Sequence, residues 1–320
     1  MTPVGLFVGL TTVDLVHRVE RPPGPDEKVV ATRADLAAGG PAANAAVTFA
    51  ALGGRAVLLT ALGDGAVASV ARADLLACRV QVMDASAAPV RDGGRVVDTP
   101  ISAATVVESS GERSVVSRNA EGVEVDVPVD LATLVSAAAV VLLDGHHPTL
   151  ALAAAHAADA AGVPVVLDAG SWKPILPELL SHVTAAVCSA DFALTGVVGD
   201  LDAMARALLA AGPTFVAVTA GPAPVRWWAG GDHGGVEVPA VPVRDTLGAG
   251  DVLHGAYAYA VAAGVADPVL ALRFAIAVAG IRVAHTGPRS WLGHPRLAED
   301  ARRLAPVDRV AKPGDYGHAR

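Results

Sequence analysis

The chain has 320 residues, of which 52% are hydrophobic and 18% charged, and its formal net charge is −8. This length allows a sizeable core in one large domain or two smaller ones, and the negative charge argues against a nucleic-acid-binding surface. The longest uncharged apolar runs, 131–143 and 256–265, are shorter than the roughly 18 residues that a membrane-spanning helix needs.

Two further observations bear on the cellular compartment in which the protein is expected. No charged segment precedes a short apolar stretch at the N-terminus, so no secretory signal is predicted. Cys78 and Cys188 have neither the spacing of a disulfide framework nor that of a metal site, which suits a reducing environment. We therefore expect a cytoplasmic protein.

The first predicted strand, 6–10, is followed closely by Asp14. Ligands bind at the edge where parallel strands end in open α/β sheets, but a turn or capping role explains an Asp at this position equally well. Residues 13–20 and 28–34 alternate loosely around a Pro- and Gly-rich stretch at 22–25. This pattern predicts a small strand pair outside the main sheet.

Paired glycines, Gly39 and Gly40, open a predicted helix that runs to about Leu52. Such glycines allow the backbone to approach a ligand closely. Asn44 would present a donor and an acceptor from the first helical turn. Because Asn has a low helix propensity, a capping role is the competing explanation.

Short β-like runs follow at 80–84, 99–108 and 113–118, and the last two predict a hairpin. From Val140 onward, strands and helices alternate with a spacing that predicts a parallel, doubly wound sheet. The units are expected at 140–143, 151–161, 163–167, 185–188, 201–211 and 215–219.

Polar residues stand at the predicted strand ends, among them Asp144, Asp168 and Thr219. His146 and its neighbour His147 do not indicate a metal site, because adjacent residues rarely face the same way. A ligand contact by His146 or Lys173 stays open.

The segment from Asp245 to Asp251, Asp-Thr-Leu-Gly-Ala-Gly-Asp, precedes a long Ala-rich helical pattern. Glycines at a loop-to-helix junction leave free N–H groups at the positive end of the helix dipole, which forms an anion cradle. A carboxylate inside such a cradle is suited to accept a proton from a hydroxyl that attacks a bound phosphoryl group. The alternative is that Asp251 only caps the helix.

This segment resembles the second sequence pattern of the ribokinase-like (PfkB) carbohydrate kinases, Asp-Thr-x-Gly-Ala-Gly-Asp, at every fixed position. The stretch 39–46 resembles the first pattern of that family, Gly-Gly-x-x-x-Asn-x-Ala. The resemblance implies an α/β fold of the ribokinase-like class: a doubly wound, mainly parallel sheet flanked by helices, with a small β-strand lid. We expect one kinase domain over 1–305, the lid at about 11–36 and 97–120, and a C-terminal tail at 306–320.

Carried over position by position, the resemblance implies roles for individual residues. Asp251 would be the general base, and Gly248, Ala249 and Gly250 together with the Asp251 amide would form the anion hole. Asp14, Gly40 and Asn44 would bind substrate hydroxyls. The nucleotide would be bound by Thr219, Gly221, Thr246, Gly248 and Gly250.

Within the family, Lys28 and the form of the first pattern resemble the branch that includes sulfofructose kinase, in which a basic residue would bind a sulfonate. Here His146 occupies that position, so we include Lys28 and His146 as substrate-binding candidates. The resemblance implies ATP and Mg²⁺ as cofactors. It also implies a monovalent cation, K⁺, near Asp245, Arg282, His285 and Gly287.

One position departs from the family pattern. Relatives often carry Asn-x-x-Glu after the strand at 185–188, but Phe192 stands here where the Glu would be. Either Asp191 replaces it or Mg²⁺ is held by ATP and water alone.

The function expected from these observations is ATP-dependent phosphorylation of a hydroxyl on a sugar or sugar-like alcohol. The alternatives are a nucleoside kinase of the same fold and a catalytically silent ligand-binding relative. We expect a sugar or sugar-acid substrate, no nucleic-acid or membrane partner, and a homodimer formed through the lid.

Overall fold

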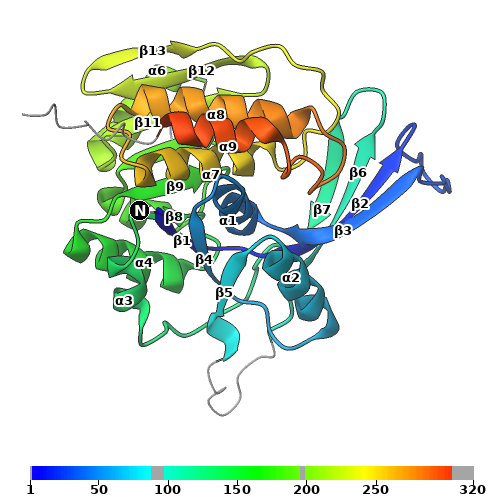
Figure 1. Ribbon diagram of the computed structural model, residues 1–320, viewed down its shortest axis with the longest axis horizontal. Coiled ribbons are helices and arrows are strands. Elements are labelled where there is room, and N and C mark those ends of the chain that lie inside the picture. The colour runs from blue at the N-terminus through cyan, green and yellow to red at the C-terminus, as the bar shows by residue number, and fades with distance from the viewer. Residues whose placement is uncertain (1, 88–96, 195–198, 305–320) are drawn as a thin grey trace, which may run out of the picture.

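The computed structural model describes residues 2–87, 97–194 and 199–304. The predicted tail at 306–320 lies outside these ranges. Two sheets organise the described chain, a large one at the centre and a smaller one that projects from one side (Figure 1).

The large sheet has nine strands in the order β13-β12-β11-β10-β9-β8-β1-β4-β5. Its strands are β1 (Val4–Val8), β4 (Arg55–Thr60), β5 (Val80–Asp84), β8 (Val140–Leu143), β9 (Val165–Ala169), β10 (Ala185–Ser189), β11 (Phe215–Ala220), β12 (Ala223–Ala229) and β13 (Asp232–Val236). All neighbours from β5 to β11 are parallel, and β12 and β13 add an antiparallel edge. The predicted doubly wound, mainly parallel sheet is confirmed.

Helices cover both faces of this sheet, which explains why its strands are apolar on both sides. On β1, Phe7 belongs to one buried cluster, whereas Leu6 and Val8 belong to the other. The first cluster includes residues of α1 (Pro41–Ala51), α2 (Ala66–Ala77), α7 (Ala249–Ala262), α8 (Pro268–Val283) and α9 (Pro295–Leu304). The second includes residues of α3 (Leu131–Ser136), α4 (Pro148–Ala161), α5 (Leu176–Leu179) and α6 (Leu201–Ala211).

The smaller sheet, which we call the lid sheet, consists of β2 (Thr12–Val19), β3 (Arg33–Gly39), β6 (Ile101–Val107) and β7 (Arg113–Ser117) in the order β3-β2-β6-β7. The β2–β6 pair is parallel and the two outer pairs are antiparallel. On its inner face, Val16, Ala104 and Val106 form a small buried cluster with Leu247, which precedes α7. The lid sheet therefore packs directly on the segment that leads into α7.

The parallel strands place their carboxyl ends along one edge of the large sheet, and α7 begins near that edge. Helices α1 and α7 pack against each other, so the glycine-rich starts of both helices converge.

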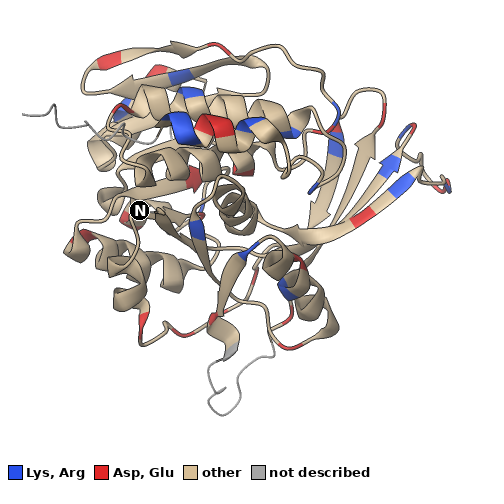
Figure 2. Cartoon of the chain, viewed as in Figure 1, with Lys and Arg blue, Asp and Glu red and all other residues tan. Residues whose placement is uncertain are grey.

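Basic and acidic residues are interspersed over the elements in the view of Figure 2. Within the described ranges, no helix has both the length and the apolar character needed to cross a membrane.

Candidate active site at the start of helix α7

Gly248 shapes the turn into α7. It is the N-cap residue and has φ 71° and ψ 11°, in the left-handed region, which side chains with a Cβ disfavour. The first amides of a helix have no acceptor within the helix, and here they point out of its N-terminal end. In the described part of the chain, the amides of Gly248, Gly250 and Asp251 have no recorded acceptor, whereas the Ala249 amide donates to the Thr246 carbonyl at 3.3 Å. Of the four amides expected in the anion hole, that of Ala249 is therefore engaged.

Asp251 lies in the first turn of α7, beside these amides. Its Oδ2 accepts a hydrogen bond of 2.8 Å from Nδ2 of Asn44, which is carried by the first turn of α1. Asp14 lies near enough for the two carboxylates to interact: burial raises the pKa of Asp14 to about 6, a hydrogen bond from Thr12 opposes the rise, and the charge of Asp251 adds to it. The structure thus brings Asp14, Asn44 and Asp251 together.

Gly40 permits the entry of the chain into α1. Its φ is 93°, and a Cβ added there would lie 2.4 Å from the Leu10 carbonyl oxygen. A Cβ on Gly39 would lie 2.1 Å from the Asp14 carboxylate. The two glycines therefore allow β3 to end directly against β1 and β2, with Asn44 facing α7 in the next turn.

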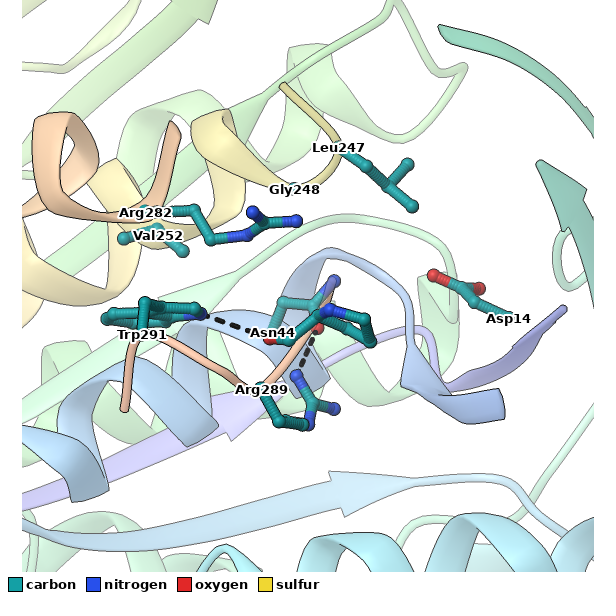
Figure 3. Close-up of a pocket in the computed structure, with 9 residues that line it drawn as sticks. Asp14, Asn44, Leu247, Gly248, Val252, Arg282, Arg289 and Trp291 are labelled. Carbon is teal, nitrogen blue, oxygen red and sulfur yellow. Dashed lines mark hydrogen bonds between the residues drawn. The ribbon is translucent and has the colours of Figure 1, made fainter. Parts of the chain in front are cut away.

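A pocket lies between these groups (Figure 3). It is lined by Asp14, Asn44, Leu247, Gly248, Val252, Arg282, Pro288, Arg289 and Trp291. Arg289 approaches Asn44, whose Oδ1 accepts from Nη1 at 3.3 Å. The same guanidinium donates to Asp74 and to the Ala38 carbonyl, so its charge is paired within the protein.

Sequence reasoning missed Arg289 and Trp291. Both follow the Thr286-Gly287-Pro288 turn after α8, and the turn residues alone gave no sign that this loop reaches α1. Only the packing of the loop against α1 and α7 makes the two residues part of the pocket.

Asp144 holds the backbone on the substrate side of the site. Its carboxylate accepts from the amides of Leu10 at 2.8 Å, Ala42 at 3.2 Å and His146 at 2.9 Å. Burial alone would raise the pKa of Asp144, but His146 and these amides together lower it below its usual range. Asp144 therefore joins the end of β1 to the start of α1.

Neither basic candidate for substrate binding lines the pocket. The His146 ring is directed at Asp144, with its Nδ1 3.2 Å from Oδ1, so this histidine supports the scaffold. Lys28 is exposed in the loop between β2 and β3. The position of a residue after a strand or in a lid loop predicts its neighbourhood but not the direction of its side chain, so substrate binding by Lys28 and His146 stays a prediction.

The residues expected to contact the nucleotide lie in two places. Thr219 is the penultimate residue of β11 and pairs with Ser189 of β10. Its Oγ1 donates to the Cys188 carbonyl at 3.3 Å, and Gly221 turns the chain into β12 with φ 58°. Thr246 instead secures the lid sheet, because its hydroxyl donates to the carbonyl of Gly111 in the β6–β7 turn at 2.9 Å.

Two of the groups expected to hold a monovalent cation, the Asp245 carboxylate and the His285 carbonyl, are already bonded to guanidinium groups. The buried Asp245 carboxylate lies 2.7 Å from Arg18 and 3.3 Å from Arg282. Arg282 also donates to the His285 carbonyl at 3.0 Å, and the Gly287 amide donates to Asp245 at 3.0 Å. Since two protein cations occupy these oxygens, the arrangement does not favour a third cation there. Arg18, from β2, was not anticipated.

Phe192, which stands where many relatives carry the Glu, is a buried packing residue. It lies against Trp172, with ring centroids 6.0 Å apart, and Asp191 beside it is exposed. Among the residues that the structure describes, no three or more His, Cys, Asp or Glu side chains form a group that could hold a metal ion.

Comparison with known proteins adds independent information. The model of the "pfkB family carbohydrate kinase" matches residues 6–293. The ribokinase of Bacillus subtilis is 27% identical over 303 residues, which are 89% of this chain and 94% of that protein.

Solved structures agree in fold. The Arabidopsis thaliana ribokinase complexed with ribose and ATP superposes with a TM-score of 0.74 at 24% identity, covering 95% of this chain and 99% of its own. The ribokinase of Giardia lamblia gives a TM-score of 0.78 at 19% identity, over 94% and 99% of the two chains. With the family model spanning most of its length, this chain is a kinase that belongs to the PfkB family of carbohydrate kinases.

Proposed function

We propose that the protein transfers the γ-phosphoryl group of ATP to a hydroxyl of a sugar or sugar-like alcohol, with Asp251 as the general base. The observation that carries this proposal is the position of the Asp251 carboxylate. It is seated in the first turn of α7 beside amides without recorded acceptors, and it is joined to Asn44 at 2.8 Å. A proton acceptor and an anion cradle in one helical turn are what transfer to an alcohol requires.

The acceptor alcohol would lie in the pocket between the lid sheet and α1. Asp14 accepts a hydrogen bond from one hydroxyl and Asn44 orients the reacting one. The alcohol oxygen attacks the γ-phosphorus, its proton passes to Asp251, and the bond from the γ-phosphorus to the bridging oxygen breaks to release ADP. The amides of Gly248, Gly250 and Asp251 stabilise the negative charge on the transferred group.

Thr219 and Gly221 are proposed to face the nucleotide, because they stand at the carboxyl end of β11, on the edge of the sheet where α7 begins. Magnesium would arrive with the ATP phosphates and neutralise their charge. Asp191 is the carboxylate nearest in sequence to the expected family position. We do not include K⁺, because Arg18 and Arg282 already bond to the Asp245 carboxylate and Arg282 to the His285 carbonyl, two of the groups expected to hold it.

The outer face of the lid sheet supports a homodimer. Leu36, Ile101 and Val116 are exposed there by 55%, 53% and 77%, and strand register places Leu36 opposite Leu15 and Val116 opposite Ala103 on the same face. We propose that a second copy covers this apolar strip. Val116→Glu should shift the sedimentation coefficient from dimer to monomer, and a wild-type monomer would refute the dimer.

The proposed function is tested by an ATP-coupled screen over sugars, sugar acids, polyols and nucleosides. We expect ADP release that depends on a sugar or polyol and a phosphorylated product of matching mass. Turnover restricted to nucleosides would replace the sugar assignment. Ligand-induced stabilisation without turnover of any acceptor would indicate a silent binding protein.

A further inference from the structure

A buried histidine, His254, lies one turn beyond Asp251 on α7. Its Nδ1 is 2.7 Å from the Gly250 carbonyl oxygen, and its Nε2 is 3.0 Å from the Val187 carbonyl oxygen of β10. The Asp168 carboxylate at the end of β9 lies 3.3 Å from Nδ1. The side chains of His254 and Asp168 are each only 6% exposed.

The two carbonyls determine how many protons the ring carries. Carbonyl oxygens only accept hydrogen bonds, and a neutral imidazole has a single N–H. With one proton, the other ring nitrogen would direct its lone pair at a carbonyl oxygen in a buried site, where an unsatisfied pair is costly. Both contacts are satisfied as hydrogen bonds only if each ring nitrogen carries a proton.

Asp168 provides the matching negative charge. Burial raises the pKa of the Asp168 carboxyl, and the charge of His254 opposes that rise. A buried imidazolium without a counter-ion would be strongly unfavourable, and the Asp168 carboxyl is the acidic group beside the ring that can supply one. The other charged groups around it are Asp251 of α7, Asp144 after β8 and Lys173 after β9, while burial raises the pKa of the Cys188 thiol on β10, which stays uncharged.

The hydrogen bond to Gly250 acts on the anion hole. The Gly250 carbonyl and the Asp251 amide belong to the same peptide plane, so a bond that fixes one end fixes the other. A charged donor at the carbonyl end polarises the peptide and strengthens its N–H as a donor. That N–H is one of the amides without a recorded acceptor at the start of α7.

We propose that His254 is a doubly protonated positioning residue, paired with Asp168, that orients and polarises the Gly250–Asp251 peptide toward the transferred phosphoryl group. This role rests on the proposed function. The ring's charge state, however, is a property of the folded protein alone and can be measured without any substrate.

The direct test is NMR of the protein labelled with ¹⁵N-histidine, with His254 assigned from its loss in His254→Gln. At pH 7.5 we expect both nitrogens of His254 to carry a proton, with the exposed His233 as the reference signal, and Asp168→Asn should return the His254 ring to one proton. A single proton on His254 at this pH overturns the proposal. Failure of every acceptor in the screen would refute the proposed function and leave this result unaffected.

Kinetics test the positioning role. In His254→Gln we expect kcat to fall by about 10-fold to 100-fold, less than the loss of a whole anion-hole donor, with the KM of the acceptor changed by less than about threefold. The alkaline decline of kcat should follow the deprotonation of His254 seen by NMR and disappear in the variant. His233→Gln serves as the matched control. A kcat within twofold of wild type, or an unchanged alkaline decline, overturns the positioning role.

Discussion

Asp245 and Asp251 stand at the two ends of one short segment, and their carboxylates meet different partners. Asp245 is 0% exposed and is bonded to Arg18, Arg282 and the amides of Leu247 and Gly287. Among the residues that the structure describes, Asp251 has one side-chain hydrogen-bond partner, Asn44. A carboxylate whose lone pairs are all engaged is suited to hold the chain in place, whereas one that retains free lone pairs can accept a proton.

The groups around the two carboxylates also differ: those near Asp245 are paired with it, whereas those near Asp251 are backbone amides. Around Asp245, Arg18 of β2 and Arg282 of α8 bind the same carboxylate and so connect the lid sheet to α8. Around Asp251, the backbone amides of Gly248, Gly250 and Asp251 have no acceptor within the described ranges, because Gly248 turns the chain at that point. One motif thus contains a structural anchor, Asp245, and the proposed general base, Asp251, and variants at each should affect different properties.

The largest effect on stability is expected at the anchor. Asp245→Asn leaves two buried guanidinium groups without a counter-ion, so we expect the free energy of unfolding to fall by about 3–5 kcal/mol. Asp35→Asn, which breaks the half-exposed Arg33–Asp35 pair, is the matched control and should cost less than about 1 kcal/mol. Equal losses in the two variants by urea denaturation would contradict the anchoring role.

A smaller effect of opposite sign is expected at Asp14. Because its pKa in the folded state, about 6, lies above the ordinary value, ionisation disfavours folding: the folded state loses stability as pH rises through the range from about 4 to 6. Asp14→Asn should therefore stabilise the protein by about 1–3 kcal/mol at pH 7.5, with no gain at pH 3.5, where both forms are neutral.

The same substitution should weaken the acceptor site. We expect the KM of the acceptor to rise in Asp14→Asn, and the wild-type KM to rise as pH falls below about 6. A melting temperature that is unchanged at pH 7.5, together with an unchanged KM, would contradict the account of Asp14.

The smallest effect is expected from the choice of salt. Because guanidinium groups already bond to the Asp245 and His285 oxygens, replacing K⁺ by Na⁺ or choline at constant ionic strength should change kcat by less than about twofold, within general salt effects. Activation by K⁺ of tenfold or more would show that a cation binds in addition to the two arginines.

The sequence indicated the surroundings of Asp251 better than those of Asp245, for a physical reason. Asn44 and Gly248–Asp251 are recognisable because glycine turns and helix starts have local patterns. Arg18 and Arg289 act through partners far along the chain, and no local spacing reveals such pairs. His254 lay inside a plain helical pattern, and its significance appears only when the carbonyl of Val187 on β10 is placed beside it.

The fold was predictable for a related reason. Alternating apolar strands and Ala-rich helices specify a sheet covered on both faces, and the large sheet follows that pattern from β8 to β11. The parallel β2–β6 pairing in the lid sheet joins segments at Thr12–Val19 and Ile101–Val107. A pairing between such distant segments depends on tertiary packing, and the hairpin signal indicated only the β6–β7 part.

The most direct test of the central claim is phosphoryl transfer by Asp251→Asn in a single turnover, with enzyme in excess over ATP and the best acceptor from the screen. The account predicts a transfer rate lower by about 10²–10⁴-fold, with an unchanged melting temperature and retained ATP binding. A rate within tenfold of wild type in a folded variant that binds ATP would contradict it.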